Sequence, residues 1–148
     1  MTSSDILSRL PYTEPFLFVD EIAHIDQDGV SGSYRFREDA YFYEGHFKGN
    51  PVTPGVILTE CMAQIGVVSL GIFLLESGTR DVQQAQQPNK LAMSSSEMDF
   101  FLPVYPGEKV TVVSKKMYFR FNKLKCEVEM FNSSGKLICK GKIAGMVY

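Results

Sequence analysis

Several features are scarce in this sequence of 148 residues or missing from it, and each excludes a class of protein. The three cysteines are an odd number with no close-spaced pair, so we expect neither a disulfide framework nor a zinc or other metal site. No basic-then-apolar leader opens the chain, which argues against a secretory signal and makes the cytoplasm the expected location. The apolar stretch at residues 65–75 is too short to span a membrane and predicts a helix buried inside the protein.

The composition is typical of a soluble globular protein, with 45% hydrophobic and 22% charged residues. We expect residues 1–148 to form one domain, because a chain of this length can bury a single core. The net charge of −2 is unevenly distributed: residues 1–100 hold 6 Lys and Arg against 14 Asp and Glu, whereas residues 101–148 hold 9 against 3. The basic part predicts either a surface that attracts an acidic partner or a plain solvated sheet face. A nucleic-acid partner is not expected.

The first part of the chain predicts a short helix and a β-hairpin. Residues 5–10 can form a helix that ends before Pro11, since the residue before a proline avoids helical geometry. A strand is predicted from residue 16 to about residue 25, followed by a two-residue turn signal at Asp28-Gly29. A second strand, residues 30–36, should pair back on the first, with one face in contact with water.

An irregular loop and a long helix follow the hairpin. Residues 43–55 contain three glycines and two prolines, which predicts a tightly specified loop. Residues 56–75 are long and apolar enough to favour a helix over a strand, and apolar side chains surround nearly its whole circumference. Residues 76–89 are polar and predict a mobile connection.

The remaining chain predicts antiparallel strands. Residues 123–130 give the clearest signal, because charged and apolar side chains alternate there with a strict period of two. The other strands are expected at 90–100, 109–119 and 136–147, with a hairpin at 132–135. A flat sheet cannot cover a helix that is apolar on all sides, but a curved sheet wrapped around it can, together with a second subunit. We therefore predict an α+β hotdog fold.

Only two histidines are available for chemistry. His24 falls in a predicted strand beside acidic residues, so a surface or structural role is expected. His46 lies between Gly45 and Phe47 in the loop whose glycines and prolines fix the backbone, a suitable mount for a rigid catalytic group.

Glu60 is the second candidate, since it is a lone carboxylate on the apolar helix. Such a group is costly to bury unless it is paired or functional, and burial would raise its pKa toward that of a useful proton donor. Gln64 lies four residues on, on the same helix face, and can orient the carboxyl group or a water molecule. A solvated groove or a salt bridge to a partner is the alternative explanation for Glu60.

Gly55 stands at the start of the helix, where backbone N–H groups lack intrahelical partners. A glycine there lets a substrate carbonyl approach the N–H closely, and such a donor stabilises enolate-like charge. A histidine base, a carboxylic acid and an amide donor match β-elimination of water. They do not form a hydrolytic triad, because no serine or cysteine is placed beside His46.

Motifs over nearly the full length resemble the bacterial 3-hydroxyacyl-[acyl-carrier-protein] dehydratases of the FabZ type. These motifs are Leu10-Pro11 with residues 15–20 (PFLFVD), Gly45-His46-Phe47 with Gly49, Pro51-Val52 and Pro54-Gly55, residues 60–64 (ECMAQ), and Pro103-Val104 with Pro106-Gly107.

The resemblance implies a role for each candidate. His46 takes the α-proton, Glu60 protonates the departing 3-hydroxyl, the Gly55 N–H holds the thioester carbonyl and Gln64 assists Glu60. It also implies a site at a dimer interface, with the histidine of one subunit facing the glutamate of the other, in a dimer or a hexamer built as a trimer of dimers. No cofactor is implied. Glutamate at position 60, where the related FabA dehydratase/isomerases carry aspartate, predicts no double-bond isomerisation.

The sequence departs from the family pattern near the expected site. Tyr12-Thr13 replaces a usual His-Arg pair, Lys48 stands where proline is usual, and Thr53 where methionine is usual. These changes leave open a specialised role on polyene, pigment or other secondary acyl chains. Phenylalanines that could line an acyl tunnel, or belong to the plain core, are Phe42, Phe47 and Phe101.

The resemblance implies an acidic acyl carrier protein as the partner, which delivers the substrate on a phosphopantetheine arm. The candidate docking residues are the cations Lys115, Lys116, Arg120, Lys123 and Lys125. Two other functions remain open. One is a hotdog acyl-thioesterase, which would cleave the thioester with a carboxylate and water. The other is a non-catalytic acyl-binding subunit, which the joint presence of His46, Gly55 and Glu60 argues against.

Overall fold

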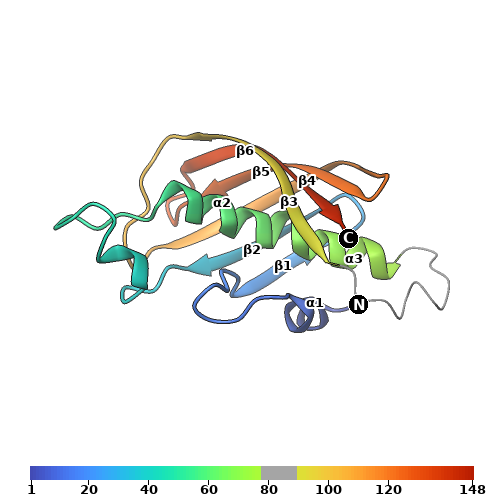
Figure 1. Cartoon of the computed structure of the whole chain (residues 1–148), viewed down its shortest axis with the longest axis horizontal. Coiled ribbons are helices and arrows are strands. Elements are labelled where there is room, and N and C mark those ends of the chain that lie inside the picture. Colours follow the sequence, from blue (N-terminus) through green and yellow to red (C-terminus); the bar gives the residue numbers. More distant parts are fainter. Residues whose placement is uncertain (78–89) are drawn as a thin grey trace.

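A curved antiparallel sheet wraps around one long helix in the computed structural model, which describes residues 1–77 and 90–148 (Figure 1). The six strands are arranged in the order β1-β2-β4-β5-β6-β3, so β1 and β3 are the two edges. Their bounds are β1 Glu21–Ile25, β2 Gly29–Arg35, β3 Leu91–Phe100, β4 Lys109–Arg120, β5 Lys123–Phe131 and β6 Leu137–Val147. A short helix, α1 (Ser3–Arg9), precedes the sheet, and one 3-10 turn, η1 (Tyr41–Tyr43), follows β2.

The central helix runs without a break from Gly55 to Ser77, as α2 (Gly55–Ala63), a π-helical turn η2 (Gln64–Val68) and α3 (Ser69–Ser77). By length and composition it could span a membrane, but 72% of its most apolar segment is buried inside the protein. It is therefore the core helix that the sequence predicts. Gly66 lets the sheet approach, because a Cβ on this residue would lie 3.0 Å from Ser114.

The core lies between this helix and the concave face of the sheet. The predicted alternation in β5 is confirmed: Leu124, Cys126, Val128 and Met130 are each at most 1% exposed. Lys123, Lys125, Glu127 and Glu129 therefore face the convex side. All three cysteines are buried and free.

The predicted first strand was wrong at its start, since β1 begins at Glu21 and not at residue 16. The backbone of residues 16–18 bonds to the central helix in place of a neighbouring strand. Phe18 N–H donates to the side chain of Gln64 over 2.8 Å, and the Phe16 carbonyl accepts from the same side chain over 3.0 Å.

The hairpin turn is also shifted by one residue from its predicted place. Asp26 N–H donates to the Gly29 carbonyl over 3.0 Å, so Gln27 and Asp28 are the central residues of the turn. Gly29 belongs to β2, where an added Cβ would lie only 2.2 Å from the Ser114 carbonyl oxygen. Glycine is thus required at position 29, because β4 lies too close for a larger side chain. The polar connection predicted at residues 76–89 lies mostly outside the described residues.

Candidate active site

The central helix presents Glu60 and Gln64 one turn apart. Gln64 is fully buried, and its Nε2 donates to Glu60 Oε2 over 2.9 Å. The other contacts of this amide, to Phe16 and Phe18, hold it in one orientation. The π-helical turn begins at Gln64, and Ser69 Oγ donates to the Gln64 carbonyl over 2.8 Å. Such turns inside α-helices occur often at functional sites.

Burial raises the pKa of the Glu60 carboxyl above its ordinary value of 4.5, whereas the hydrogen bond from Gln64 lowers it, and the net direction is upward. The desolvation of the charged form outweighs the single hydrogen bond that stabilises it. Glu60 therefore keeps its proton to higher pH than an exposed glutamate, as a general acid requires.

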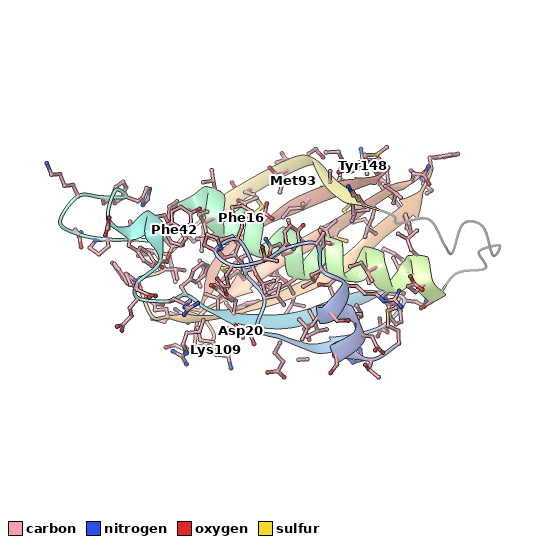
Figure 2. All side chains as sticks on the ribbon, turned by 60° about the horizontal axis from the view of Figure 1, so that its bottom comes forward. Phe16, Asp20, Phe42, Met93, Lys109 and Tyr148 are labelled. Carbon is pink, nitrogen blue, oxygen red and sulfur yellow. The ribbon has the colours of Figure 1, made fainter. Side chains whose placement is uncertain are left out.

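Glu60 borders a cavity of about 420 Å³ between the helix and strands β3 and β6. Its walls are mainly apolar and include Phe16, Val67 and Leu91. Met93 and Tyr148, both among its lining residues, lie toward the β3 and β6 side of the molecule, away from Phe42 (Figure 2).

Among the lining residues of this cavity, only Glu60 was predicted as a site residue from the sequence; the lining residues with polar side chains that were missed are Tyr12, Lys90 and Tyr148. Burial, together with the nearby Glu60, raises the pKa of Tyr12 to about 12, so its phenol stays neutral. The departure from the family pattern at position 12 was the one signal that pointed to it. Lys90 and Tyr148 pair through their backbones, with Tyr148 N–H donating to the Lys90 carbonyl over 2.9 Å.

His46 is held by the loop before α2. Its Nδ1 lies 2.7 Å from the Val52 carbonyl oxygen, and since a carbonyl only accepts, Nδ1 carries the proton. In the neutral imidazole, Nε2 is then the nitrogen without a proton and can act as a base. Phe47 stacks on the imidazole with 4.5 Å between ring centroids, and its backbone has the left-handed φ of 52°. Residues in this region of φ often mark functional sites.

His46 and Gly55 line one shared cavity of about 390 Å³. Phe47 and Phe101, two of the three predicted tunnel residues, also line it, and Phe100 covers the helix start. A Cβ added to Gly55 would lie 3.3 Å from the Phe100 ring, so glycine keeps the space above the first helical N–H groups open. Phe42, the third predicted tunnel residue, packs between Tyr41 and Tyr43 and is not among the residues that line this cavity.

Within one chain, the cavity at His46 and the cavity at Glu60 share no lining residue. The structure thus brings His46 together with Gly55, and Glu60 together with Gln64, but it does not unite the two pairs in one subunit.

The five cations considered for docking lie on β4 and β5 near the hairpin that joins these strands. Lys115 pairs in register with Glu127, and Arg120 lies 4.5 Å from the Tyr118 ring centroid. The β4–β5 hairpin lies far from the His46 loop. That loop follows the end of β2 that pairs with the start of β4, whereas the hairpin follows the end of β4 (Figure 1). The cluster is closer to the cavity at Glu60. Val147 N–H of β6 donates to the Asn122 carbonyl of the same hairpin, and the next residue, Tyr148, lines that cavity.

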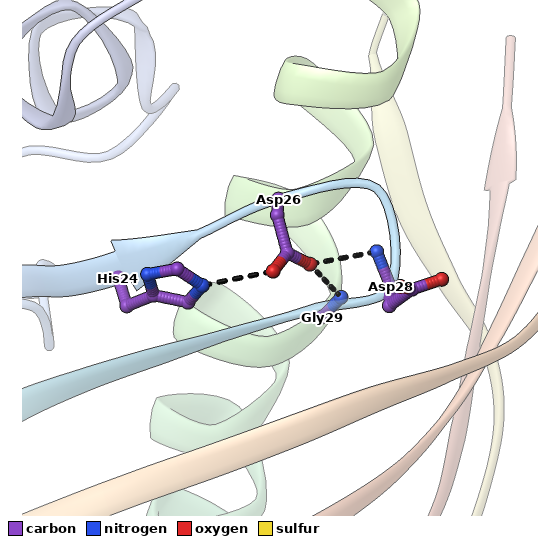
Figure 3. A network of polar contacts seen from close by, with 4 residues as sticks. All are labelled: His24, Asp26, Asp28 and Gly29. Carbon is purple, nitrogen blue, oxygen red and sulfur yellow. Dashed lines mark hydrogen bonds and ion pairs between the residues drawn. The ribbon is translucent and has the colours of Figure 1, made fainter.

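His24 has the structural setting that the sequence predicts. Its side chain is 69% exposed, and its Nε2 lies 2.8 Å from Asp26 Oδ2. The other oxygen of Asp26 accepts from the backbone N–H groups of Asp28 and Gly29, which fixes the turn (Figure 3). The bond from His24 and those backbone groups lower the pKa of Asp26.

Comparison with known proteins identifies the family. Residues 10–146 match the model of the FabA-like domain. The chain belongs to the FabA-like family. It is similar to the 3-hydroxyacyl-[acyl-carrier-protein] dehydratase FabZ of Herpetosiphon aurantiacus, with 36% identity over 129 residues that cover 83% of each chain. The FabZ of Geobacter metallireducens is 30% identical over 143 residues, which cover 95% of this chain and 85% of that one.

Solved structures support the hotdog fold of this FabA-like chain. The dehydratase heterocomplex ApeI:P from Xenorhabdus doucetiae has a TM-score of 0.76 at 11% identity, covering 99% of this chain and 91% of that one. A hypothetical thioesterase with coenzyme A from Streptococcus pneumoniae has a TM-score of 0.62 at 14% identity, covering 86% and 84%. The predicted fold class is confirmed.

Proposed function

We propose that the chain is a 3-hydroxyacyl-[acyl-carrier-protein] dehydratase, which forms the trans-2-enoyl thioester in fatty-acid or related acyl-chain biosynthesis. The proposal rests on the settings of two groups. The Val52 carbonyl accepts from Nδ1 of His46, which leaves Nε2 of the neutral imidazole as the base, and burial raises the pKa of the Glu60 carboxyl. The family and the FabZ relatives support the same reaction.

In the proposed mechanism, the thioester carbonyl accepts a hydrogen bond from the Gly55 N–H. His46 Nε2 removes the α-proton, and the negative charge that develops on the carbonyl oxygen is stabilised by this donor and the positive end of the helix dipole. The electron pair forms the new double bond, the bond to the 3-hydroxyl breaks, and Glu60 supplies the proton that turns this group into water. The proton held by His46 then returns to Glu60 through solvent, which restores both groups.

A homodimer is proposed to complete the site. Strand β3 is an edge of the sheet among the described strands, and most of its ten side chains are exposed. An edge of this length invites pairing with another chain. Phe100 at one end of β3 lines the cavity at His46, whereas Leu91 at the other end lines the cavity at Glu60. If β3 pairs antiparallel with its copy about a two-fold axis, the two ends exchange places, so each His46 cavity comes to face a Glu60 cavity of the second subunit. A hexamer would consist of three such dimers.

The partner is proposed to be an acidic acyl carrier protein in the cytoplasm. The cations near the β4–β5 hairpin, with Lys90 at the Glu60 cavity, would attract it. Charge reversal of Lys123 and Lys125 should then raise KM and flatten its dependence on salt, whereas reversal of Lys109 at the far end of β4 should leave both unchanged.

The test is incubation with a 3-hydroxyacyl carrier protein, followed by intact mass and by the absorbance of the conjugated product. Loss of one water with rising absorbance supports the proposal. Release of free carrier thiol without a rise in absorbance would establish a thioesterase instead. An unchanged substrate that stays bound would establish an acyl-binding subunit.

A further inference from the structure

A buried pair of hydroxyl groups lies directly behind the His46 loop. Tyr43 Oη and Thr53 Oγ1 are 2.6 Å apart, and the two residues are 7% and 4% exposed. The backbone of Thr53 is anchored as well, since its N–H donates over 2.8 Å to the carbonyl of Val104, a fully buried residue.

This pair is adjacent in the chain to the two groups that hold His46. Val52, which precedes Thr53, supplies the carbonyl that accepts from Nδ1 over 2.7 Å. Phe42, which precedes Tyr43, supplies the carbonyl that accepts from the His46 backbone N–H over 3.1 Å. The contacts form a closed ring: Phe42 to His46, His46 to Val52, and Thr53 back to Tyr43.

One further contact holds Val52 to the loop, since its N–H donates to the His46 carbonyl over 3.5 Å, a long distance for a hydrogen bond. Residues 47–51, the tip of the loop, are all exposed, and the loop turns through left-handed backbone at Phe47 and Gly49. Phe47 stacks on one face of the imidazole but makes no hydrogen bond that distinguishes its two nitrogens. The selection of the tautomer therefore depends on the position of Val52.

We propose that Thr53 and Tyr43 are positioning residues for His46 in the dehydration proposed above. Their hydroxyl pair holds the Val52 carbonyl in place, and this carbonyl keeps the proton on Nδ1 and directs Nε2 toward the substrate.

The alternative is a pair that only stabilises the fold, and a double variant separates the two roles. Tyr43→Phe or Thr53→Val alone leaves one buried hydroxyl without a partner, which costs stability. Together they remove both partners, so most of that stability should return. A purely structural pair would then regain its activity as well, whereas a positioning pair would not.

The experiment measures kcat, KM, thermal unfolding and the 15N shifts of the His46 ring nitrogens for both single variants, the double variant and Thr53→Ser. Tyr34→Phe is the control, because Tyr34 is a buried tyrosine at 6% exposure that packs on Phe18 and Phe36 away from the loop. We expect kcat to fall about tenfold to a hundredfold in the double variant with KM little changed, since small misplacements of a catalytic group have effects of this order. The 15N shifts should show mixed tautomers in that variant, and wild-type values in Thr53→Ser and Tyr34→Phe.

A double variant with wild-type kcat and unchanged 15N shifts would overturn the inference while leaving the dehydratase function intact. A wild-type protein that does not dehydrate the substrate would overturn the proposed function. The 15N shifts would then still decide whether the pair sets the tautomer of His46.

Discussion

Gln64 Nε2 donates to Glu60 Oε2 over 2.9 Å, and the same amide group ties the central helix to the backbone of residues 16–18. One side chain thus orients the acid and anchors the segment that the sequence analysis assigned to a strand. The bond also stabilises the charged form of Glu60, which opposes the effect of burial on its pKa.

Replacement of Gln64 by leucine should affect stability and the pH profile together. The Phe18 N–H would lose its acceptor, and each orphaned buried donor costs about 1–3 kcal/mol. Without the Gln64 bond the pKa of Glu60 should rise further, so Glu60 stays protonated to higher pH and the basic limb of the pH–rate profile should move upward. Denaturant unfolding and kcat across pH measure the two effects.

Ser114→Ala is the control for this variant, because Ser114 is a buried residue that donates to the Gly66 carbonyl over 2.8 Å and lines neither cavity. It should lower stability and leave the basic limb in place. If Gln64→Leu moves the limb no more than Ser114→Ala does, Gln64 does not act on Glu60.

Glu60→Gln should stabilise the protein at neutral pH while it abolishes dehydration. The folded-state pKa of Glu60 is raised above 4.5, so between that value and the raised pKa the folded state binds more protons than the unfolded state. The free energy of unfolding therefore falls as the pH rises through this window. The variant lacks the titrating group, so its advantage should be absent below pH 4.5 and should grow above it, as urea unfolding at a series of pH values can show.

The two histidines should respond differently to replacement by alanine. His46→Ala should lower kcat by about 10²–10⁴, the usual contribution of a positioned base. His24→Ala should leave kcat unchanged, because the His24 side chain is exposed and, among the described residues, bonds to Asp26 of the β1–β2 turn. Equal losses of activity in the two variants would contradict the role of His46.

The sequence predicted those elements in which the order of apolar and charged residues shows directly which side chains are buried. The alternation in β5 and the apolar central helix belong to this group, since each side chain there is apolar or charged according to the face it occupies. Residues 16–18 were misassigned because an apolar run does not reveal where its backbone groups bond. Their partner, Gln64, lies 46 or more positions away in the chain.

The candidate site also has features that the sequence could suggest and features that it could not. His46, Glu60, Gly55 and Gln64 could be proposed as site residues from the sequence, because each is a chemically unusual residue for its local setting. The cavity around Glu60 could not be predicted, since Tyr12 and Tyr148 come from opposite ends of the chain and line it together only in the folded structure. The separation of His46 from Glu60 within one subunit also follows from the fold and not from spacing.

Mixed dimers test whether His46 of one subunit and Glu60 of the other form one site. His46→Ala and Glu60→Gln subunits carrying different tags are co-expressed, and the heterodimer is purified through both tags. It contains one intact site and one doubly disabled site, so it should show about half of the wild-type activity per dimer, although each parent homodimer is inactive. A heterodimer as inactive as its parents would contradict the shared site.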